Sequence, residues 1–139
     1  AAIAAPTAKN NQPYKIWKLA SAAAMDKLKQ ATHYTFGAEL ALIVGVKYDE
    51  AFIRPFDKVN FAQIDGSIVA THIMLAVQDE GLGTTWVGYF DAPKLQELFP
   101  EMQGYELIAI FPVGYPAEGA KPSNRHEDRR PLKEAVVEL

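Results

Sequence analysis

The stretch Gly81-Leu82-Gly83-Thr84-Thr85-Trp86-Val87-Gly88 sets the order of the elements around it in this chain of 139 residues. It follows a long apolar run, and Gly81 fits the position just after a helix, with Leu82 as the apolar contact that accompanies such an end. Residues Thr84 to Val87 then favour a short strand that stops at Gly88. Because glycine has no Cβ, a flat ligand can lie there directly on backbone N–H groups.

The two glycines that open this stretch do not form a dinucleotide-binding fingerprint. That fingerprint needs a strand, then glycines, then a helix, whereas the order here is helix, glycines, strand, and position 86 is Trp86 instead of glycine. The chain has no cysteine, and Ser67 lies inside an expected helix without the second glycine of a nucleophile elbow. We therefore expect a bound cofactor, and no metal or catalytic side chain, to carry any chemistry.

The composition is that of one globular domain, which we expect to span residues 1–139. Hydrophobic residues make up 49% of the chain and charged residues 22%. A formal net charge of −3 argues against a nucleic-acid partner. No apolar run approaches the roughly 20 residues that span a bilayer, so no membrane partner is expected and a cytoplasmic location is the default.

Periodicity and punctuation predict an α+β fold with a central, mainly antiparallel sheet flanked by helices, because strands and helices do not alternate strictly. Strands are expected over Tyr14–Leu19, Glu39–Val46, Thr84–Val87 and Tyr105–Val113, and helices over Ser21–Ala31, Phe61–Glu80 and Ala92–Phe99. Lys47 to Asn60 is expected to be a loop or lid. Pro131 to Leu139 is expected to be a tail that pairs with a partner or adds a strand.

The helix expected over Phe61–Glu80 is apolar nearly all round. Ile64, Ile68 and Leu75 fall on one side, while Val69 and Ile73 belong to the rest of its surface. Such a helix is buried, either in the core or against a partner subunit.

Two further segments are candidates for ligand binding, although each also has a structural explanation. The segment Pro6-Thr7-Ala8-Lys9-Asn10-Asn11-Gln12-Pro13-Tyr14 offers backbone and amide donors, but these residue types are common in surface loops. Arg129 and Arg130 match the geometry of a phosphate, but a mixed charge run is usually a solvated face. The residues alone leave both alternatives open.

Taken together and in this order, the segments resemble the FMN-dependent nitroreductase family over nearly the whole chain. The first loop resembles the family's Pro-Ser-x-x-Asn-x-Gln-Pro-Trp, with Thr7 in place of Ser and Tyr14 in place of Trp. Thr84 to Gly88 resembles its Thr-Cys-Trp-Ile-Gly strand. Ile110-Phe111-Pro112-Val113-Gly114-Tyr115-Pro116 resembles its last core strand, and Arg129-Arg130-Pro131-Leu132 its closing Arg-x-Pro-Leu. Family members usually begin with a helix and an Arg-Arg-Ser-x-Arg-type segment that supplies much of the phosphate site, and this sequence starts after it.

The resemblance implies an intertwined homodimer that binds FMN at its interface. Backbone N–H groups of Val87 and Gly88 would then lie near the flavin ring, bordered by the backbone of Thr85 and Trp86. The remaining cofactor-binding residues would be Pro6, Thr7, Ala8 and Asn10, which reach the FMN of the other subunit, and Arg129 and Arg130 at the phosphate.

The activity implied is that of an FMN-dependent NAD(P)H oxidoreductase, a flavoprotein enzyme. NADH or NADPH and then a small-molecule acceptor, a nitroaromatic or a quinone, would use the same face of the flavin in a ping-pong route. The loop Lys47 to Asn60 would be the acceptor lid. The alternatives are a flavin-binding relative with other chemistry, such as reductive dehalogenation or flavin breakdown, and a non-catalytic dimeric module with a decayed FMN site.

Overall fold

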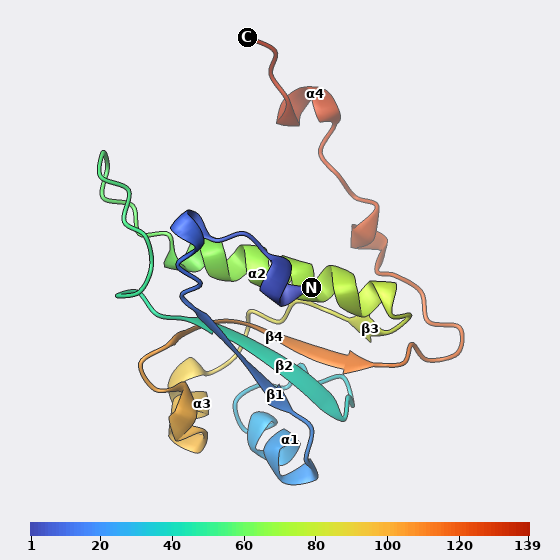
Figure 1. Cartoon of the computed structure of the whole chain (residues 1–139). Coiled ribbons are helices and arrows are strands. Elements are labelled where there is room, and N and C mark those ends of the chain that lie inside the picture. Colours follow the sequence, from blue (N-terminus) through green and yellow to red (C-terminus); the bar gives the residue numbers. More distant parts are fainter.

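The computed structural model describes all residues 1–139, and its elements follow one another as the sequence predicts, with boundaries shifted by a few residues (Figure 1). The strands are β1 (Tyr14–Leu19), β2 (Leu40–Val46), β3 (Gly83–Thr84) and β4 (Glu106–Gly114). The α-helices are α1 (Ala22–Leu28), α2 (Ala62–Asp79), α3 (Ala92–Leu98) and α4 (Leu132–Ala135). Short 3₁₀ turns cover Ala2–Ala4, Ala8–Asn10, Pro100–Met102 and Asn124–His126.

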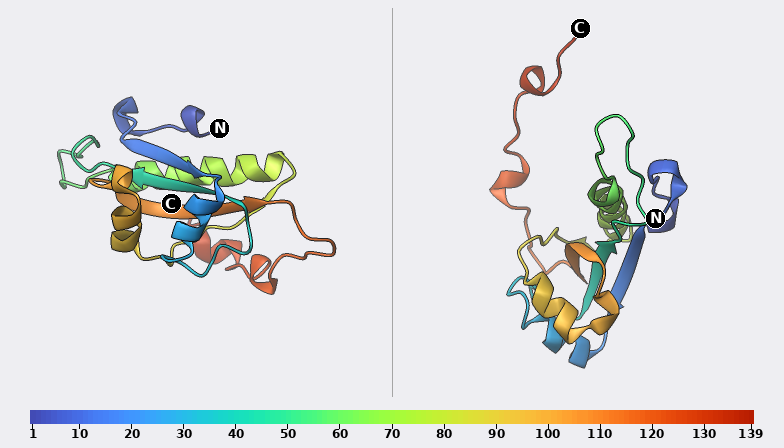
Figure 2. Two further views of the ribbon diagram at one scale, coloured as in Figure 1. Left: turned by 90° about the horizontal axis from the view of Figure 1, so that it is seen from below. Right: turned by 90° about the vertical axis from the view of Figure 1, so that its left-hand side faces the viewer.

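One four-stranded sheet in the order β1-β2-β4-β3 forms the centre, and every pair of neighbours is antiparallel. Helix α2 covers one face, and α1 and α3 lie on the other (Figures 1 and 2). The alternation of side chains along β2 explains the two cores: Ile43 packs with α1 and α3, whereas Val44 packs with α2. The α+β class with an antiparallel sheet is therefore confirmed.

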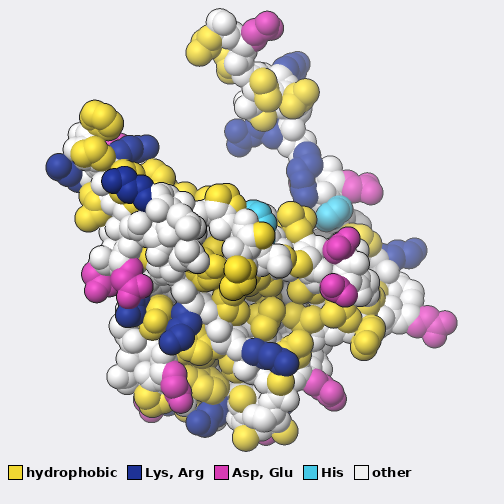
Figure 3. All heavy atoms as spheres, in the orientation of Figure 1, with side chains coloured by type: hydrophobic (Ala, Val, Ile, Leu, Met, Phe, Trp, Pro, Cys, Tyr) yellow, Lys and Arg dark blue, Asp and Glu magenta, His cyan; other side chains and the backbone are white.

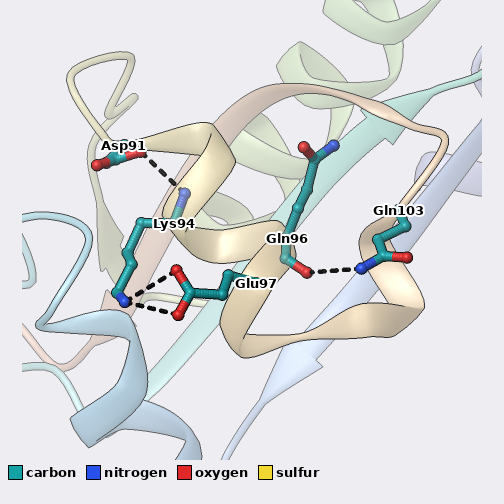
Figure 4. Close-up of polar contacts among 5 residues, drawn as sticks. All are labelled: Asp91, Lys94, Gln96, Glu97 and Gln103. Carbon is teal, nitrogen blue, oxygen red and sulfur yellow. Dashed lines mark hydrogen bonds and ion pairs between the residues drawn. The ribbon is translucent and has the colours of Figure 1, made fainter.

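Local capping explains where the short helices begin. The Ser21 hydroxyl accepts a hydrogen bond from the Ala24 N–H at 3.2 Å, and the Asp91 carboxylate accepts one from the Lys94 N–H at 2.9 Å. Figure 4 shows the second cap, together with the 3.0 Å ion pair between Lys94 and Glu97 on the same helix. Both caps lie where the sequence predicts them.

Helix α2 ends in a Schellman motif, as Gly81 and Leu82 predict. Gly81 adopts a φ of 72° and donates to the Gln78 carbonyl at 3.0 Å, while the Leu82 N–H donates to Val77 at 3.1 Å. The left-handed glycine turns the chain back toward the sheet, where β3 begins two residues later.

The burial of α2 is more one-sided than the sequence suggests. Val69, Ala70, Ile73 and Val77 face the sheet and are buried. Ile64 is 42% exposed and Leu75 62% exposed, so part of the apolar surface stays uncovered in the single chain. The apolar surface of this helix was expected to be buried in the core or against a partner subunit. The core buries only one side of the helix.

Two expected strands differ from those observed. The tail, where a strand was one expectation, forms a single helical turn at Leu132–Ala135 and stands away from the body (Figure 1). The strand expected over Thr84–Val87 is limited to Gly83–Thr84, followed by an isolated bridge between Val87 and Ile110.

None of the helices combines the length and the apolarity that crossing a bilayer requires.

Candidate functional site

The interruption of β3 has a cause on the neighbouring strand. The pair Val87 and Ile110 exchanges both of its hydrogen bonds at 3.0 Å, so the next hydrogen-bonded pair toward the end of β4 would be Thr85 and Pro112. Pro112 has no N–H to donate, and its carbonyl accepts instead from the Thr84 hydroxyl at 2.7 Å. The ladder therefore breaks at Thr85 and resumes at Val87.

The same alternation decides which backbone groups face the open edge of the sheet. β3 is the last strand of the sheet, and successive residues direct their N–H groups to opposite sides. The Val87 N–H points toward β4. By the same alternation, the N–H groups of Trp86 and Gly88 are directed toward the edge that no strand covers. In this structure the Val87 N–H, which was expected to lie near the flavin ring, donates to the Ile110 carbonyl at 3.0 Å.

Gly88 is bordered by open space. A Cβ built on it would meet only Trp86 Nε1, at 3.9 Å, and the glycine does not have a positive φ. Trp86, 37% exposed, packs edge-on against Phe111 with ring centroids 5.3 Å apart, while the Val87 side chain enters the core on the opposite face. The Gly88 backbone is thus exposed directly after Val87, the residue that is fixed to β4.

The N-terminal loop, residues 6–13, is the second part of the predicted site, and its backbone is strained. Lys9, Asn10 and Gln12 have φ values of 53°, 57° and 51°, in the left-handed region that non-glycine residues rarely adopt. The Thr7 hydroxyl accepts from the Gln12 N–H at 3.0 Å, which gives the hydroxyl at position 7 a structural role. Pro6 precedes this turn and is exposed.

Asp65 anchors this loop to the body of the protein, a role that the sequence analysis missed. Its Oδ1 accepts a hydrogen bond from the Ala8 N–H at 2.9 Å, and its side chain is 1% exposed. A signal for it was present in the sequence, because Asp65 lies on the i, i+4 series that continues through Val69, Ile73 and Val77. An acid on the buried stripe of a helix indicates a polar partner inside the fold.

The loop Lys47 to Asn60 folds back on itself and packs beside the N-terminal loop. Ile53 and Asn60 form an isolated antiparallel bridge, and the Lys9 ammonium lies 5.0 Å from the ring centroid of Phe52. Phe56, near the tip, is 93% exposed. Figure 3 shows hydrophobic and basic side chains gathered at this tip, at the upper left.

An ion pair closes the tip of that loop. Arg54 donates from Nε to Asp57 Oδ1 at 2.7 Å and from Nη2 to the other oxygen. This hydrogen-bonded guanidinium holds the pKa of Asp57 below its usual value of 3.8. Asp57 therefore stays ionised at neutral pH.

Arg129 and Arg130 lie on the exposed tail that precedes α4. Arg129 Nη1 donates to the carbonyls of Arg125 and Asp128 at 2.7 and 2.9 Å, which curls the tail around its guanidinium. The tail extends from the end of β4 into solvent (Figure 1). Within one chain the tail does not meet the edge at Gly88 or the N-terminal loop.

The structure therefore places the predicted site residues in three separate groups. Gly88 follows an edge strand, the N-terminal loop is fixed at the start of α2, and the arginines lie on the tail. Asp65 and the last residue of α2, Asp79, are 14 residues apart, which is about 21 Å along a helix. The loop is thus at the opposite end of α2 from the turn that leads into β3.

Comparisons with known proteins agree with this architecture. A sequence model described as the nitroreductase family matches residues 35–115, more than half of the chain. A nitroreductase family protein from Clostridium difficile 630 is 34% identical, with a TM-score of 0.88 over 98% of this chain and 79% of that chain. A protein from Exiguobacterium sibiricum, solved in complex with FMN, shares the fold with a TM-score of 0.81 at 16% identity; the match covers 99% of this chain and 82% of that chain.

A curated relative matches over a shorter stretch. Iodotyrosine deiodinase from Nematostella vectensis is 38% identical over 66 residues, which are 47% of this chain. The match spans only 24% of the length of that enzyme.

Proposed function

The chain belongs to the nitroreductase family, and we propose that it is an FMN-dependent NAD(P)H oxidoreductase that reduces nitroaromatics or quinones. The observation that carries the proposal is the exposed backbone at Gly88, where an added Cβ would meet only Trp86 Nε1 at 3.9 Å, next to Val87, whose N–H is bonded to β4. The fold shared with an FMN complex supports the choice of cofactor.

The residues at this edge fit a flat ring with hydrogen-bond acceptors on its rim. Gly88 leaves room that a Cβ would fill, and because the Val87 N–H is bonded to Ile110, strand alternation directs the Gly88 N–H away from β4, toward an acceptor on the ring. In our proposal Gly88 and the backbone of Thr85 and Trp86 hold the ring, while Val87 fixes the edge by its bonds to β4. Arg129 and Arg130 hold the phosphate through guanidinium groups suited to its geometry.

When bound, FMN supplies the redox chemistry between NAD(P)H and the acceptor. The residues of the chain position the ring, donate a hydrogen bond from the Gly88 N–H and limit the access of water. No side chain near Gly88 is placed as a general acid or base in this proposal. The tip of the Lys47–Asn60 loop, with Phe56, remains our candidate for the part that covers the acceptor.

We further propose that the active form is a homodimer. One chain keeps the N-terminal loop, the Gly88 edge and the arginines apart, so a second copy is required to bring the three groups to one ligand. Exposed apolar side chains on α2 and on the tail are available for that contact, among them Leu75 and Val137, 62% and 76% exposed. Light scattering coupled to sizing chromatography tests this, and a monomer at all concentrations would contradict it.

The test of the cofactor is the visible absorption spectrum of the purified protein after incubation with FMN and desalting. We expect flavin bands that remain with the protein and are bleached by NADH or NADPH in the absence of oxygen, then restored by a quinone. Protein that retains no flavin would refute the enzymatic proposal and favour a non-catalytic dimeric module.

Reductive dehalogenation is the second candidate reaction, because of the 66-residue match to iodotyrosine deiodinase. It is separated from the first by supplying the reduced protein with either a nitroaromatic or an iodinated phenol. Release of iodide without turnover of the nitroaromatic would favour the second candidate.

A further inference from the structure

We propose that Asp65 is a positioning residue that holds the N-terminal loop, residues 6–13, in the strained shape in which it contacts FMN. The inference rests on the proposed function for its link to FMN. The anchoring itself rests on the contacts of Asp65 and Ala8 within one chain.

Burial makes the polar contact of Asp65 necessary. The side chain is 1% exposed and sits in the first turn of α2, one turn before the fully buried Val69. Placing a carboxyl group in such a position is costly unless it is hydrogen-bonded. The hydrogen-bond partner of this group is the Ala8 N–H, 2.9 Å from Oδ1, whereas Oδ2 is buried without a partner. The Ala8 bond is therefore what offsets the burial.

The loop needs an external anchor because its own backbone is unfavourable. Non-glycine residues rarely adopt the left-handed region, asparagine excepted, and three residues within four positions lie in it, Lys9, Asn10 and Gln12. Strained conformations persist only where the surroundings determine them. The side-chain bonds within the loop are exposed, such as that from Gln12 Nε2 to the Asn10 carbonyl at 3.3 Å. Asp65 is the buried side chain that ties the loop to the body at Ala8, while buried Pro13 and its bond from the Lys47 N–H at 2.8 Å fix the other end.

The consequence is that the loop should be preformed before FMN arrives. A ligand that binds a preformed loop does not have to supply the free energy of ordering it. Without the anchor we expect the loop to relax from its left-handed turns, and FMN affinity to fall about tenfold, which corresponds to the loss of one ordinary hydrogen bond.

Two substitutions at Asp65, with a packing control, separate the hydrogen bond from simple packing. Asp65→Asn keeps an oxygen that accepts from Ala8, whereas Asp65→Leu keeps the branched shape, adds volume and removes the acceptor. Val69→Ala is the matched control, because it removes buried methyl groups from the same helix without touching the loop. Circular dichroism establishes that each variant is folded at the temperature of the assay.

Limited trypsin digestion reports on the loop without any flavin. Lys9 is exposed and lies next to Ala8, so the release of peptide by cleavage after Lys9 measures how often the loop opens. We expect rapid release from Asp65→Leu and slow release from the wild type, Asp65→Asn and Val69→Ala. Equal release from Asp65→Leu and wild type would overturn the inference, as would release from Val69→Ala as rapid as that from Asp65→Leu.

An FMN titration of the same proteins links the anchor to the site. Ala8→Pro is added because it removes the donor from the exposed side of the bond, and Thr7 already has the extended backbone that precedes proline. If Asp65→Leu does not fold, Ala8→Pro provides the test in its place. We expect Ala8→Pro and Asp65→Leu to weaken FMN binding about equally, and Asp65→Asn to retain it. A wild type that binds no FMN would refute the proposed function and leave the trypsin result standing. Wild-type FMN affinity in Ala8→Pro would overturn the inference alone.

Discussion

Replacing Gly88 with leucine tests the proposed flavin-binding edge without disturbing the fold. A Cβ at this position meets only Trp86 Nε1 at 3.9 Å, and the backbone is not in the left-handed region, so the folded chain has room for a side chain. Replacing glycine at a compatible backbone changes the free energy of unfolding by about 0.4–1 kcal/mol, in the stabilising direction. The urea midpoint should therefore be unchanged or slightly raised.

The effect on FMN should be much larger. Leucine fills the space beside the Gly88 N–H and prevents a ring from reaching it, which removes a hydrogen bond of about 0.5–1.5 kcal/mol. If about 100 Å² of apolar ring surface is no longer buried, about 2.5 kcal/mol is lost in addition at roughly 25 cal/mol per Å². The sum, about 3–4 kcal/mol, corresponds to a rise in Kd of a few hundredfold.

The assay is a fluorescence titration of FMN into wild type, Gly88→Leu and a matched control, Gly114→Leu. Gly114 lies at the far end of β4, where an added Cβ likewise meets nothing within 4 Å. The control should bind FMN as the wild type does. Unchanged FMN affinity in a folded Gly88→Leu protein would show that the ring does not lie on this edge.

Three further predictions concern packing, charge and pH. Gly66→Ala should destabilise the protein by about 1–3 kcal/mol in urea unfolding, because its Cβ would lie 2.6 Å from Val46 Cγ1 on the sheet beneath α2. Arg129→Ala should weaken the binding of FMN about tenfold or more but leave riboflavin, which lacks the phosphate, unaffected; equal losses for both would place the arginine elsewhere. The Arg54–Asp57 pair should stabilise the loop tip above pH 3.8 and lose this effect as the pH falls through the lowered pKa of Asp57, which an NMR titration with Arg54→Gln as control can follow.

Much of the fold was predictable because its signals are local. Ser21 and Asp91 are short polar residues placed before apolar helical periods, and Gly81 supplies a left-handed end, so three helix boundaries follow from neighbouring residues. The break at Thr85 was not predictable in the same way. It depends on Pro112, a residue of another strand whose register is set only when the sheet assembles.

In the candidate site, too, features that depend on neighbouring residues could be predicted, and features that depend on distant residues could not. Gly88 and Thr7 could be singled out from the sequence, and the structure gives each a defined setting. The availability of the Val87 N–H could not be predicted, because it depends on whether residue 86 or 87 faces β4. Asp65 escaped notice because its partner, Ala8, is 57 residues away and contributes a backbone group that no motif records.

The break opposite Pro112 also affects how the edge of the sheet moves. Thr84 and Val87 are both fixed to β4, whereas the two residues between them lack ladder bonds. These two residues can fluctuate by local opening, which costs far less than unfolding the sheet. The protein thus combines a rigid sheet with one compliant span of backbone, and amide exchange at Thr85 and Trp86 should be fast while that at Val87 and Ile110 is slow. We expect such a span to let the edge change shape locally while β3 and the Val87–Ile110 bridge keep their register.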